Sequence, residues 1–216
     1  MKSRLKSEAR RSPGPEPGRV VRGLTKRYGS VRTGADPFSV LVATVLSQRC
    51  RDATTDSVTD RLLSVYPTAG ALAAAPVGSI EKLIRRSGFY RVKAERLKRI
   101  ARIIMDEYGG EVPREVERLL ELPGVGRKTA NCVLVYGFGA DAIPVDTHVH
   151  RISNRLGWVK TKTPEQTEKA LEKFLDRKHW IPVNKLLVEF GKDICRPVRP
   201  RCGDCPFSGA CPASSC

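Results

Sequence analysis

Lys128 is the residue of this sequence whose type and setting best suit nucleophilic chemistry. It follows the string LPGVG, and the apolar pattern after it predicts that a helix begins near Arg127. The positive end of such a helix disfavours the ammonium form of a lysine in its first turn. An amine that loses its proton easily can form a Schiff base with a sugar carbon, so Lys128 is a candidate catalytic nucleophile.

Asp146, in the string IPVDTHVHR, is the candidate partner of that lysine. A carboxylate can take up a proton or stabilise a developing positive charge. The alternative is a plain helix cap, because Asp146 stands directly before a helical pattern. That alternative is strong for an isolated aspartate, but it weakens when Lys128, a Gly-rich turn and a cysteine cluster occur in the same chain.

Four cysteines near the C-terminus have the spacing C-x6-C-x2-C-x5-C. Thiolates this close in sequence can converge on one metal centre, and the intervening Pro and Gly residues let the chain wrap it. Zinc sites usually combine two short cysteine pairs, and only one such pair is present here. The sequence therefore favours an iron–sulfur cluster over zinc, with the ligands Cys195, Cys202, Cys205 and Cys211.

The segment REVERLLELPGVGRKTANCVLVYGF predicts two helices joined by a Gly-rich turn. We expect the first helix to end near Leu122 and the second to begin near Arg127. Gly124 and Gly126 can adopt backbone angles barred to other residues and let another backbone approach. The N–H groups at the start of the second helix would suit a phosphate. An ordinary helical hairpin is the alternative.

The composition limits what kind of protein this is. With 216 residues, of which 40% are hydrophobic, one large or two small globular domains are expected. No run of apolar residues is long enough for a membrane span, and the first residues lack the apolar middle of a secretory signal, which predicts an intracellular protein. The net charge of +16 predicts an anionic partner, most commonly nucleic acid, although a merely basic protein is the alternative.

Helices are the elements expected to position these residues. Residues 1–17 alternate charge with Pro and Gly and predict a disordered arm. Asp36-Pro37 and Thr163-Pro164 each place a capping side chain before a proline, which predicts two helix starts. One buried helical face is predicted for Leu97, Ile100, Ala101, Ile104 and Tyr108. Because no alternating strand series is found, the predicted fold class is all-α.

The strings LPGVGRKTAN and VDTHVHR and the terminal cysteine spacing resemble the endonuclease III family of the helix-hairpin-helix DNA glycosylase superfamily. The resemblance runs from about Asp36 to Cys211. It implies two α-helical lobes with DNA in the cleft between them. Residues 30–140 would form a helical-barrel lobe with the hairpin, and residues 18–29 and 141–216 would form a lobe around a [4Fe-4S] cluster with a mainly structural role.

This resemblance implies a monomeric DNA glycosylase and abasic-site (AP) lyase of base excision repair. It would act on oxidised pyrimidines in double-stranded DNA and, in a prokaryote, lie with the nucleoid. Lys128 would attack C1′ of the damaged nucleotide, and Asp146 would assist its deprotonation or stabilise charge on the sugar. The imine then acidifies the neighbouring sugar hydrogen, and β-elimination cuts the strand on the 3′ side. The damaged base must first leave the stack.

The resemblance also implies contacts to DNA. Phe89, flanked by Arg86 and Arg91, falls where the family carries an apolar wedge, and packing in the core is the alternative. The family often has a Gln that fills the gap left by the flipped base. Here Gln48 stands one residue early and Arg49 occupies the usual place, which leaves the gap-filling residue and the preferred opposite base open.

Further candidate contacts follow from the same comparison of motifs. The hairpin and the segment after Asp146 supply Leu122, Gly124, Val125, Gly126, Arg127, His148 and Arg151. A structural role is the alternative for His148. Three arginines lie between the first two cysteine ligands and predict phosphate contact: Arg196, Arg199 and Arg201. The alternative is a solvated charged loop.

Two rival functions remain compatible with the sequence. One is a glycosylase that removes thymine or uracil opposite guanine, which the altered VLSQRCRD segment keeps open. The other is a non-enzymatic DNA-binding or electron-transfer protein that uses the cluster alone. Lys128 favours a bifunctional enzyme over the first rival, because superfamily members that only remove the base carry another residue at its position. The presence of both Lys128 and Asp146 argues against the second rival, because a protein without catalytic activity has no need for the pair.

Overall fold

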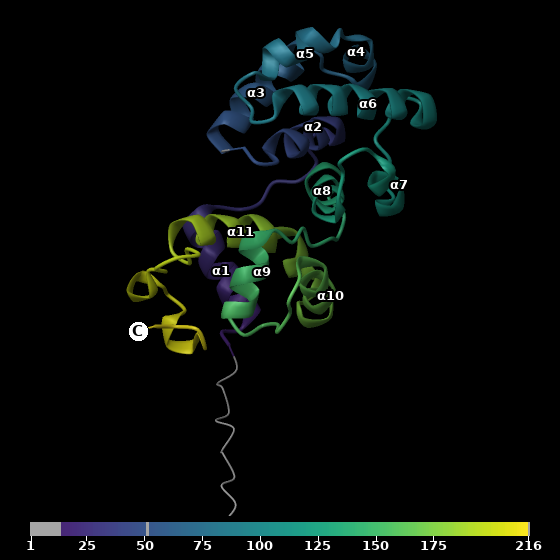
Figure 1. The fold of residues 1–216 in the computed structure, drawn as a ribbon. Coiled ribbons are helices and arrows are strands. Elements are labelled where there is room, and N and C mark those ends of the chain that lie inside the picture. The colour runs from purple at the N-terminus through teal and green to yellow at the C-terminus, as the bar shows by residue number, and fades with distance from the viewer. Residues whose placement is uncertain (1–13, 51, 216) are drawn as a thin grey trace, which may run out of the picture. The chain divides into compact units, whose positions relative to one another are not determined.

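A computed structural model describes residues 14–50 and 52–215, and all regular elements within them are helices (Figure 1). This confirms the all-α prediction. The helices are α1 (Pro17–Tyr28), α2 (Pro37–Ser47), α3 (Asp52–Val65), α4 (Ala69–Ala74), α5 (Val77–Ile84), α6 (Tyr90–Tyr108), α7 (Val116–Glu121), α8 (Arg127–Cys132), α9 (Thr147–Arg155), α10 (Pro164–Phe174) and α11 (Trp180–Asp193). A π-helical segment, Val133–Gly137, continues α8, and short 3₁₀ turns lie at Arg177–His179, Cys202–Asp204 and Ser208–Ala210.

The chain folds into two compact units. The central unit, Val31–Pro144, contains α2 to α8. The terminal unit combines the described residues up to Ser30 with those from Val145 onward, so it contains α1, α9, α10, α11 and residues 195–211, which we call the cysteine segment. Within the described residues no helix is both long and apolar enough to cross a membrane.

The long helix α6 organises the central unit. Helices α4 and α5 pack along one side of it and α2 packs along another (Figure 1). Four of the five residues of the predicted face are fully buried, and Tyr108, at the end of the helix, is half-buried. Helix α2 begins as predicted, because the carboxylate of Asp36 accepts a hydrogen bond from the N–H of Ser39 at 2.8 Å.

The terminal unit packs α1, α9 and α11 around buried Val, Leu, Ile and Phe side chains. Helix α10 begins as predicted: the hydroxyl of Thr163 accepts from the N–H of Gln166 at 3.3 Å. The Gln166 side chain in turn accepts from the N–H of Lys162 at 3.0 Å, so both side chains satisfy helix-start donors.

The predicted arm falls partly outside the described residues, which begin at residue 14. Within the terminal unit, Glu16 caps α1 by accepting from the N–H groups of Gly18 and Arg19 at 2.7 and 2.6 Å. The carbonyl of Pro15 accepts a hydrogen bond from the buried indole of Trp158 at 2.7 Å. The residues directly before Pro17 are therefore held against this unit.

Candidate functional site

The hairpin forms as predicted, with α7 ending at Glu121 and α8 starting at Arg127. The N–H of Val125 donates to the carbonyl of Leu122 at 3.0 Å and closes the turn. Gly124 has a φ of +74°, a conformation that L side chains rarely adopt, and an added Cβ would collide with the side chain of Arg96. Lys128 is the second residue of α8 and is half-buried.

The hairpin presents backbone rather than apolar side chains to its surroundings. Leu122 and Val125 are buried, so neither presents its side chain to a ligand, and their contact with DNA remains a prediction. Gly126 is exposed in an ordinary extended conformation, with a φ of −94°, and open space surrounds the position of a Cβ there. Arg127 is exposed beside it. This surface suits the close approach of another backbone.

Asp146 is the N-cap of α9 in the terminal unit. Its Oδ1 accepts from the N–H groups of His148 and Val149 at 2.9 and 2.8 Å. The capping alternative therefore holds, but both capping bonds use the same oxygen. Lys128 belongs to the central unit and Asp146 to the terminal unit, so their catalytic pairing remains a prediction.

His148 and Arg151 pack against α11 one turn along from Asp146. Nη2 of Arg151 donates to the carbonyl of Cys195 at 2.9 Å and lies 3.1 Å from Nδ1 of His148. Gly191 leaves room for both, because a Cβ there would overlap them. Burial lowers the pKa of Arg151. These contacts give both side chains a structural role, and their contact with DNA remains a prediction.

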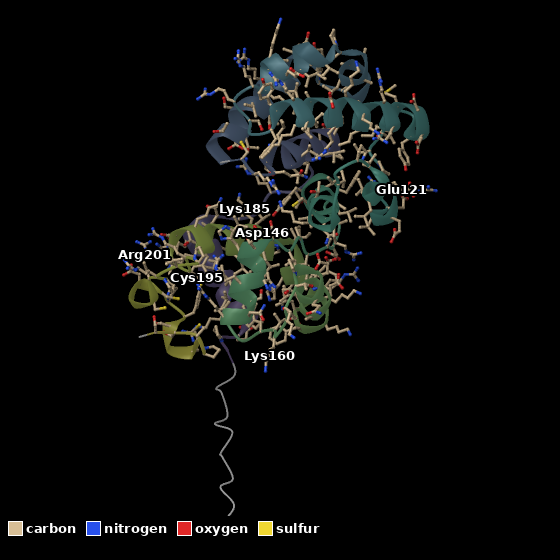
Figure 2. The ribbon with its side chains drawn as sticks, viewed as in Figure 1. Glu121, Asp146, Lys160, Lys185, Cys195 and Arg201 are labelled. Carbon is tan, nitrogen blue, oxygen red and sulfur yellow. The ribbon has the colours of Figure 1, made fainter. Side chains whose placement is uncertain are left out.

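The four cysteines line one small cavity in the terminal unit. It measures about 30 Å³, and the apolar side chains of Leu156, Phe190 and Ile194 also face it. Burial raises the pKa of the Cys205 and Cys211 thiols, and the neighbouring thiols add to this. Figure 2 shows Cys195 just beyond the end of α11.

The donor set fits the predicted cluster. Four sulfurs that share one apolar cavity match the thiolate ligands of an iron–sulfur cluster. In the described part of the chain, no group of three or more His, Cys, Asp or Glu side chains is preformed as a metal site, so the ligand set remains a prediction.

Arg155 clamps the cysteine segment, a role that the sequence analysis missed. Its guanidinium donates to the carbonyls of Arg196 and Pro197 at 2.6 and 2.9 Å and lies 3.5 Å from Sγ of Cys195. Its own carbonyl accepts from the thiol of Cys211 at 3.3 Å. The signal available in the sequence was its position one helical turn after Arg151.

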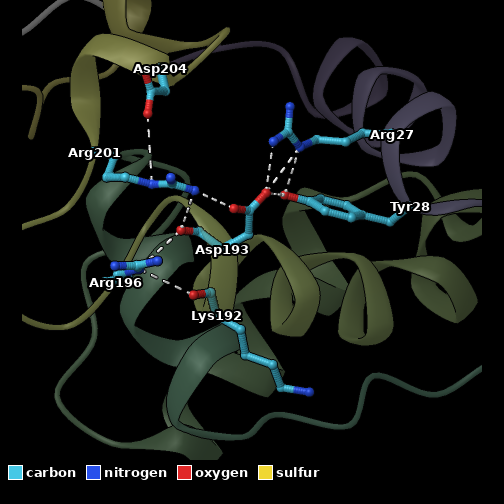
Figure 3. Close-up of polar contacts among 7 residues, drawn as sticks. All are labelled: Arg27, Tyr28, Lys192, Asp193, Arg196, Arg201 and Asp204. Carbon is cyan, nitrogen blue, oxygen red and sulfur yellow. Dashed lines mark hydrogen bonds and ion pairs between the residues drawn. The ribbon is translucent and has the colours of Figure 1, made fainter.

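Asp193 joins α1, α11 and the cysteine segment (Figure 3). Its Oδ2 accepts from the hydroxyl of Tyr28 and from Arg27, both at 2.8 Å, and Oδ1 contacts Arg201. Nε of Arg196 donates to the Asp193 carbonyl at 3.1 Å. Two of the three predicted phosphate-binding arginines thus hold the segment in place, and phosphate contact by the three remains a prediction.

A hollow of about 380 Å³ lies in the central unit between the segment after α2 and the start of α6. Phe89 lines it and is 62% exposed, so the alternative that it packs in the core is wrong. The guanidinium of Arg49, also exposed, lies 5.6 Å from the centre of the Phe89 ring. Arg91 is exposed, and its guanidinium lies 5.5 Å from the Tyr90 ring.

Gln48 points along the hollow toward the hairpin. Its amide donates to the carbonyl of Gly124 at 3.0 Å, and its oxygen accepts from Arg96 at 3.0 Å. Both ends of the Gln48 side chain are therefore engaged, whereas Arg49 faces solvent beside Phe89.

Comparison with known proteins links this arrangement to DNA repair. Residues 42–177 match the family model of the HhH-GPD superfamily of base excision DNA repair proteins. The chain is 52% identical to endonuclease III of Thermotoga maritima over 192 residues, which cover 89% of this chain and 90% of the relative. It is 39% identical to endonuclease III of Bacillus subtilis over 178 residues, which cover 82% and 81% of the two chains.

Solved structures show the same likeness. An endonuclease III trapped as a covalent intermediate with DNA matches with a TM-score of 0.83 and 35% identity, over 93% of this chain and 97% of that one. A thermostable thymine-DNA glycosylase matches with a TM-score of 0.81 and 26% identity, over 91% and 94% of the two chains.

Proposed function

The chain belongs to the endonuclease III family of the HhH-GPD superfamily, and on this premise we propose that it is a bifunctional DNA glycosylase and AP lyase. Its substrates would be oxidised pyrimidines and abasic sites in double-stranded DNA, bound by one copy of the chain. The observation that carries the proposal is Lys128 in the first turn of the hairpin's second helix, in a chain 35% identical to an enzyme captured covalently on DNA.

The reaction would run through Lys128. Its neutral amine attacks C1′ of the damaged nucleotide, and the bond from C1′ to the base breaks as the base leaves with the electron pair. Loss of the amine proton and opening of the sugar give an imine between Nζ and C1′. Removal of a hydrogen from C2′ then expels the 3′ phosphate by β-elimination, and water releases the lysine.

Asp146 would be the carboxylate of this reaction. Its Oδ1 holds the α9 cap, so Oδ2 would take up a proton from the attacking amine or stabilise the positive charge that develops on the sugar. A single residue would thus position a helix and serve the chemistry with different oxygen atoms.

DNA recognition would combine the hairpin with the hollow around Phe89. The exposed backbone of Gly124 and Gly126 would approach a phosphate beside Arg127. Phe89 would enter the stack as the wedge, because an exposed aromatic ring can stack on bases. Arg49 would fill the gap left by the flipped base, since Gln48 is engaged with Gly124 and Arg96.

Cys195, Cys202, Cys205 and Cys211 would hold a [4Fe-4S] cluster. When bound, the cluster cross-links four points of the terminal unit, and cleavage of a glycosidic bond requires no redox change. Arg151 and Arg155 would keep the cysteine segment against α9 and α11.

The second candidate function is removal of thymine or uracil opposite guanine. The likeness to a thymine-DNA glycosylase, with a TM-score of 0.81, and Arg49 in the gap-filling position support it. Sequence identity to that protein, 26%, is lower than the 52% to an endonuclease III, so oxidised pyrimidines are the primary proposal.

Borohydride trapping separates the two candidates, because it reduces the imine to a stable bond. One duplex carries a single thymine glycol and another a uracil–guanine pair. We expect a covalent adduct on thymine glycol that disappears in Lys128→Ala and persists in the control Lys160→Ala, whose lysine is exposed in the other unit. An adduct only on the mismatch would support the second candidate, and no adduct on either would contradict the lysine mechanism.

A further inference from the structure

Lys93 is a buried charged residue of the central unit that the proposed reaction does not use. It lies in the first turn of α6 and is 3% exposed. Its ammonium donates to the carbonyl of Leu46 at 2.7 Å and to the hydroxyl of Ser87 at 2.8 Å. Because burying an ammonium is costly, both partners are needed to hold it there, and such a residue requires an explanation.

The two partners of Lys93 come from the two segments whose exposed side chains, Arg49 and Phe89, line the hollow. Leu46 precedes Gln48 and Arg49 at the end of α2, and Ser87 precedes Phe89 at the start of α6. Each segment turns through a left-handed residue, Arg49 with a φ of +54° and Phe89 with a φ of +59°. Non-glycine residues adopt this conformation only where the surroundings enforce it.

The two turns also touch one another beyond Lys93. A Cβ added to Gly88 would lie 3.1 Å from the carbonyl oxygen of Arg49, so the two backbones are in contact. The Arg49 guanidinium lies over the Phe89 ring at 5.6 Å. Burial opposes ionisation of the Cys50 thiol, but hydrogen bonds with Thr55, Gly88 and Ser87 and the nearby Lys93 ammonium lower its pKa. The bonds to Gly88 and Ser87 connect the residue after Arg49 to the segment before Phe89.

We propose that Lys93 is a positioning residue whose buried ammonium ties the Arg49 turn to the Phe89 turn, so that both side chains enter the base stack as one rigid pair. The tie itself stands on the contacts above, while its use on DNA rests on the proposed function. A wedge and a gap filler act on the same base pair at the same moment. Holding them together before binding avoids the entropy cost of ordering two separate loops on the DNA.

The test replaces the ammonium without removing bulk, in Lys93→Met. The matched control is Lys98→Met, since Lys98 lies on the same helix and also donates to a backbone carbonyl, that of Ala75, but does not line the hollow. Single-turnover excision is measured on thymine glycol in a fully paired duplex and in a duplex that lacks the opposite nucleotide. The second duplex has no partner base to displace, so it needs no coordinated wedge and filler.

We expect Lys93→Met to slow excision about tenfold or more on the paired duplex, because small misplacements near the reacting groups have large effects. The loss on the duplex without the opposite nucleotide should be clearly smaller, and Lys98→Met should change neither rate. Ser87→Ala keeps the lysine and removes one of its two hydrogen bonds, so its excision rate on the paired duplex should lie between those of the unmodified protein and Lys93→Met. Equal losses on both duplexes would overturn the proposal, because general destabilisation does not distinguish the substrates.

A measurement without DNA separates this proposal from the proposed function. Hydrogen exchange of the backbone amides in residues 86–92 should become faster in Lys93→Met and stay unchanged in Lys98→Met. Unchanged exchange would refute the tie even if excision fell. If the unmodified protein excised no base from any duplex, the proposed function would fail, and the exchange result would still decide whether Lys93 joins the two turns.

Discussion

Asp146 uses one carboxylate oxygen for both of its capping hydrogen bonds. The two roles proposed for this residue can therefore be separated by substitution. Asp146→Asn keeps a side-chain oxygen that can cap α9 but removes the negative charge, whereas Asp146→Ala removes both. We expect the Asn variant to keep the melting temperature of the native protein and to lose base excision by about 10²-fold or more.

The Ala variant provides the comparison, since loss of a cap costs about 1 kcal/mol. Asp146→Ala should therefore be less stable than Asp146→Asn while both are equally impaired in excision. Thermal unfolding and single-turnover rates measured on the same samples decide the matter. Full activity in the Asn variant would mean that Asp146 is a cap and nothing more.

His179 is a buried histidine of the terminal unit, and we expect it to make folding stability depend on pH. Burial lowers its pKa and Lys178 lowers it further, while Asp176 and Glu16 oppose this and Arg22 adds to it. Between this lowered pKa and the ordinary value of about 6.5, the unfolded chain binds more protons than the folded chain. Folding stability should therefore fall as the pH falls through this window.

Denaturant unfolding followed by tryptophan fluorescence measures this effect, because both tryptophans, Trp158 and Trp180, lie in the terminal unit. The free energy of unfolding should drop as the pH falls below the ordinary histidine value of about 6.5, and the drop should be smaller in His179→Gln. An identical pH dependence in the two proteins would rule out a contribution from His179.

At the scale of elements, the two glycines of the hairpin turn serve different purposes. Gly124 has a positive φ and packs against Arg96, so Gly124→Ala should destabilise the central unit by more than about 1 kcal/mol. Gly126 has an ordinary φ and open space around it, so Gly126→Ala should leave stability unchanged.

In DNA binding, by contrast, Gly126→Ala should be the more impaired of the two variants. A methyl group at Gly126 stands where a phosphate would approach the backbone, so Gly126→Ala should bind DNA more weakly although it folds normally. Calorimetric melting and binding to a labelled duplex, measured for both variants, give the comparison. Native affinity in Gly126→Ala would argue against a phosphate at this turn.

The clamp formed by Arg155 belongs to this scale too, because it joins α9 to the segment that carries the cysteines. Arg155→Ala removes hydrogen bonds to two backbone carbonyls and should let a bound cluster decay faster in the presence of a chelator. Visible absorbance of the cluster over time is the measurement. The control is Arg99→Ala, an exposed arginine of α6 in the other unit, and equal decay in both variants would contradict the clamp.

How far the sequence predicted these elements depends on the range of the interactions. The caps at Asp36 and Thr163 and the start of α8 are local signals, and the structure confirms them. The resemblance placed Phe89 as a wedge, and the structure confirms that its side chain is exposed, whereas the burial of Lys93 depends on contacts with residues far away in the chain, such as Leu46. No local pattern contains that information, so the hollow and the tie beside it emerged only from the structure.

At the scale of the whole molecule, the hydrophobic periodicity predicted the all-α fold class. It did not predict that many basic side chains form hydrogen bonds within the protein. The net charge of +16 predicted an anionic partner. Yet Arg27, Arg151, Arg155 and Arg201 are engaged within the terminal unit by carbonyl and carboxylate groups. By composition alone, all four side chains are available to DNA. In the structure, Arg151, Arg155 and Arg201 hold the cysteine segment, and Arg27 binds Asp193 at the end of α11.

The salt dependence of DNA binding measures how many cations remain for phosphates. Each phosphate neutralised releases counterions, so about six such contacts would weaken binding about 10³-fold between roughly 50 and 200 mM salt. Lys128→Ala is the suitable protein, because without the proposed nucleophile it should not turn over its substrate. Phosphate contacts carry no information about the base, so the slope should be the same for duplexes with and without a thymine glycol.

Damage recognition should then appear as a constant difference in affinity between the two duplexes at every salt concentration. A substitution at Arg127 should lower the slope, while Arg201→Ala should leave the slope unchanged, because Asp193 and Asp204 hold that guanidinium. A lowered slope in Arg201→Ala would instead place the cysteine segment directly on the DNA. In that case the contacts of Asp193 would orient an arginine for phosphate binding rather than withdraw it.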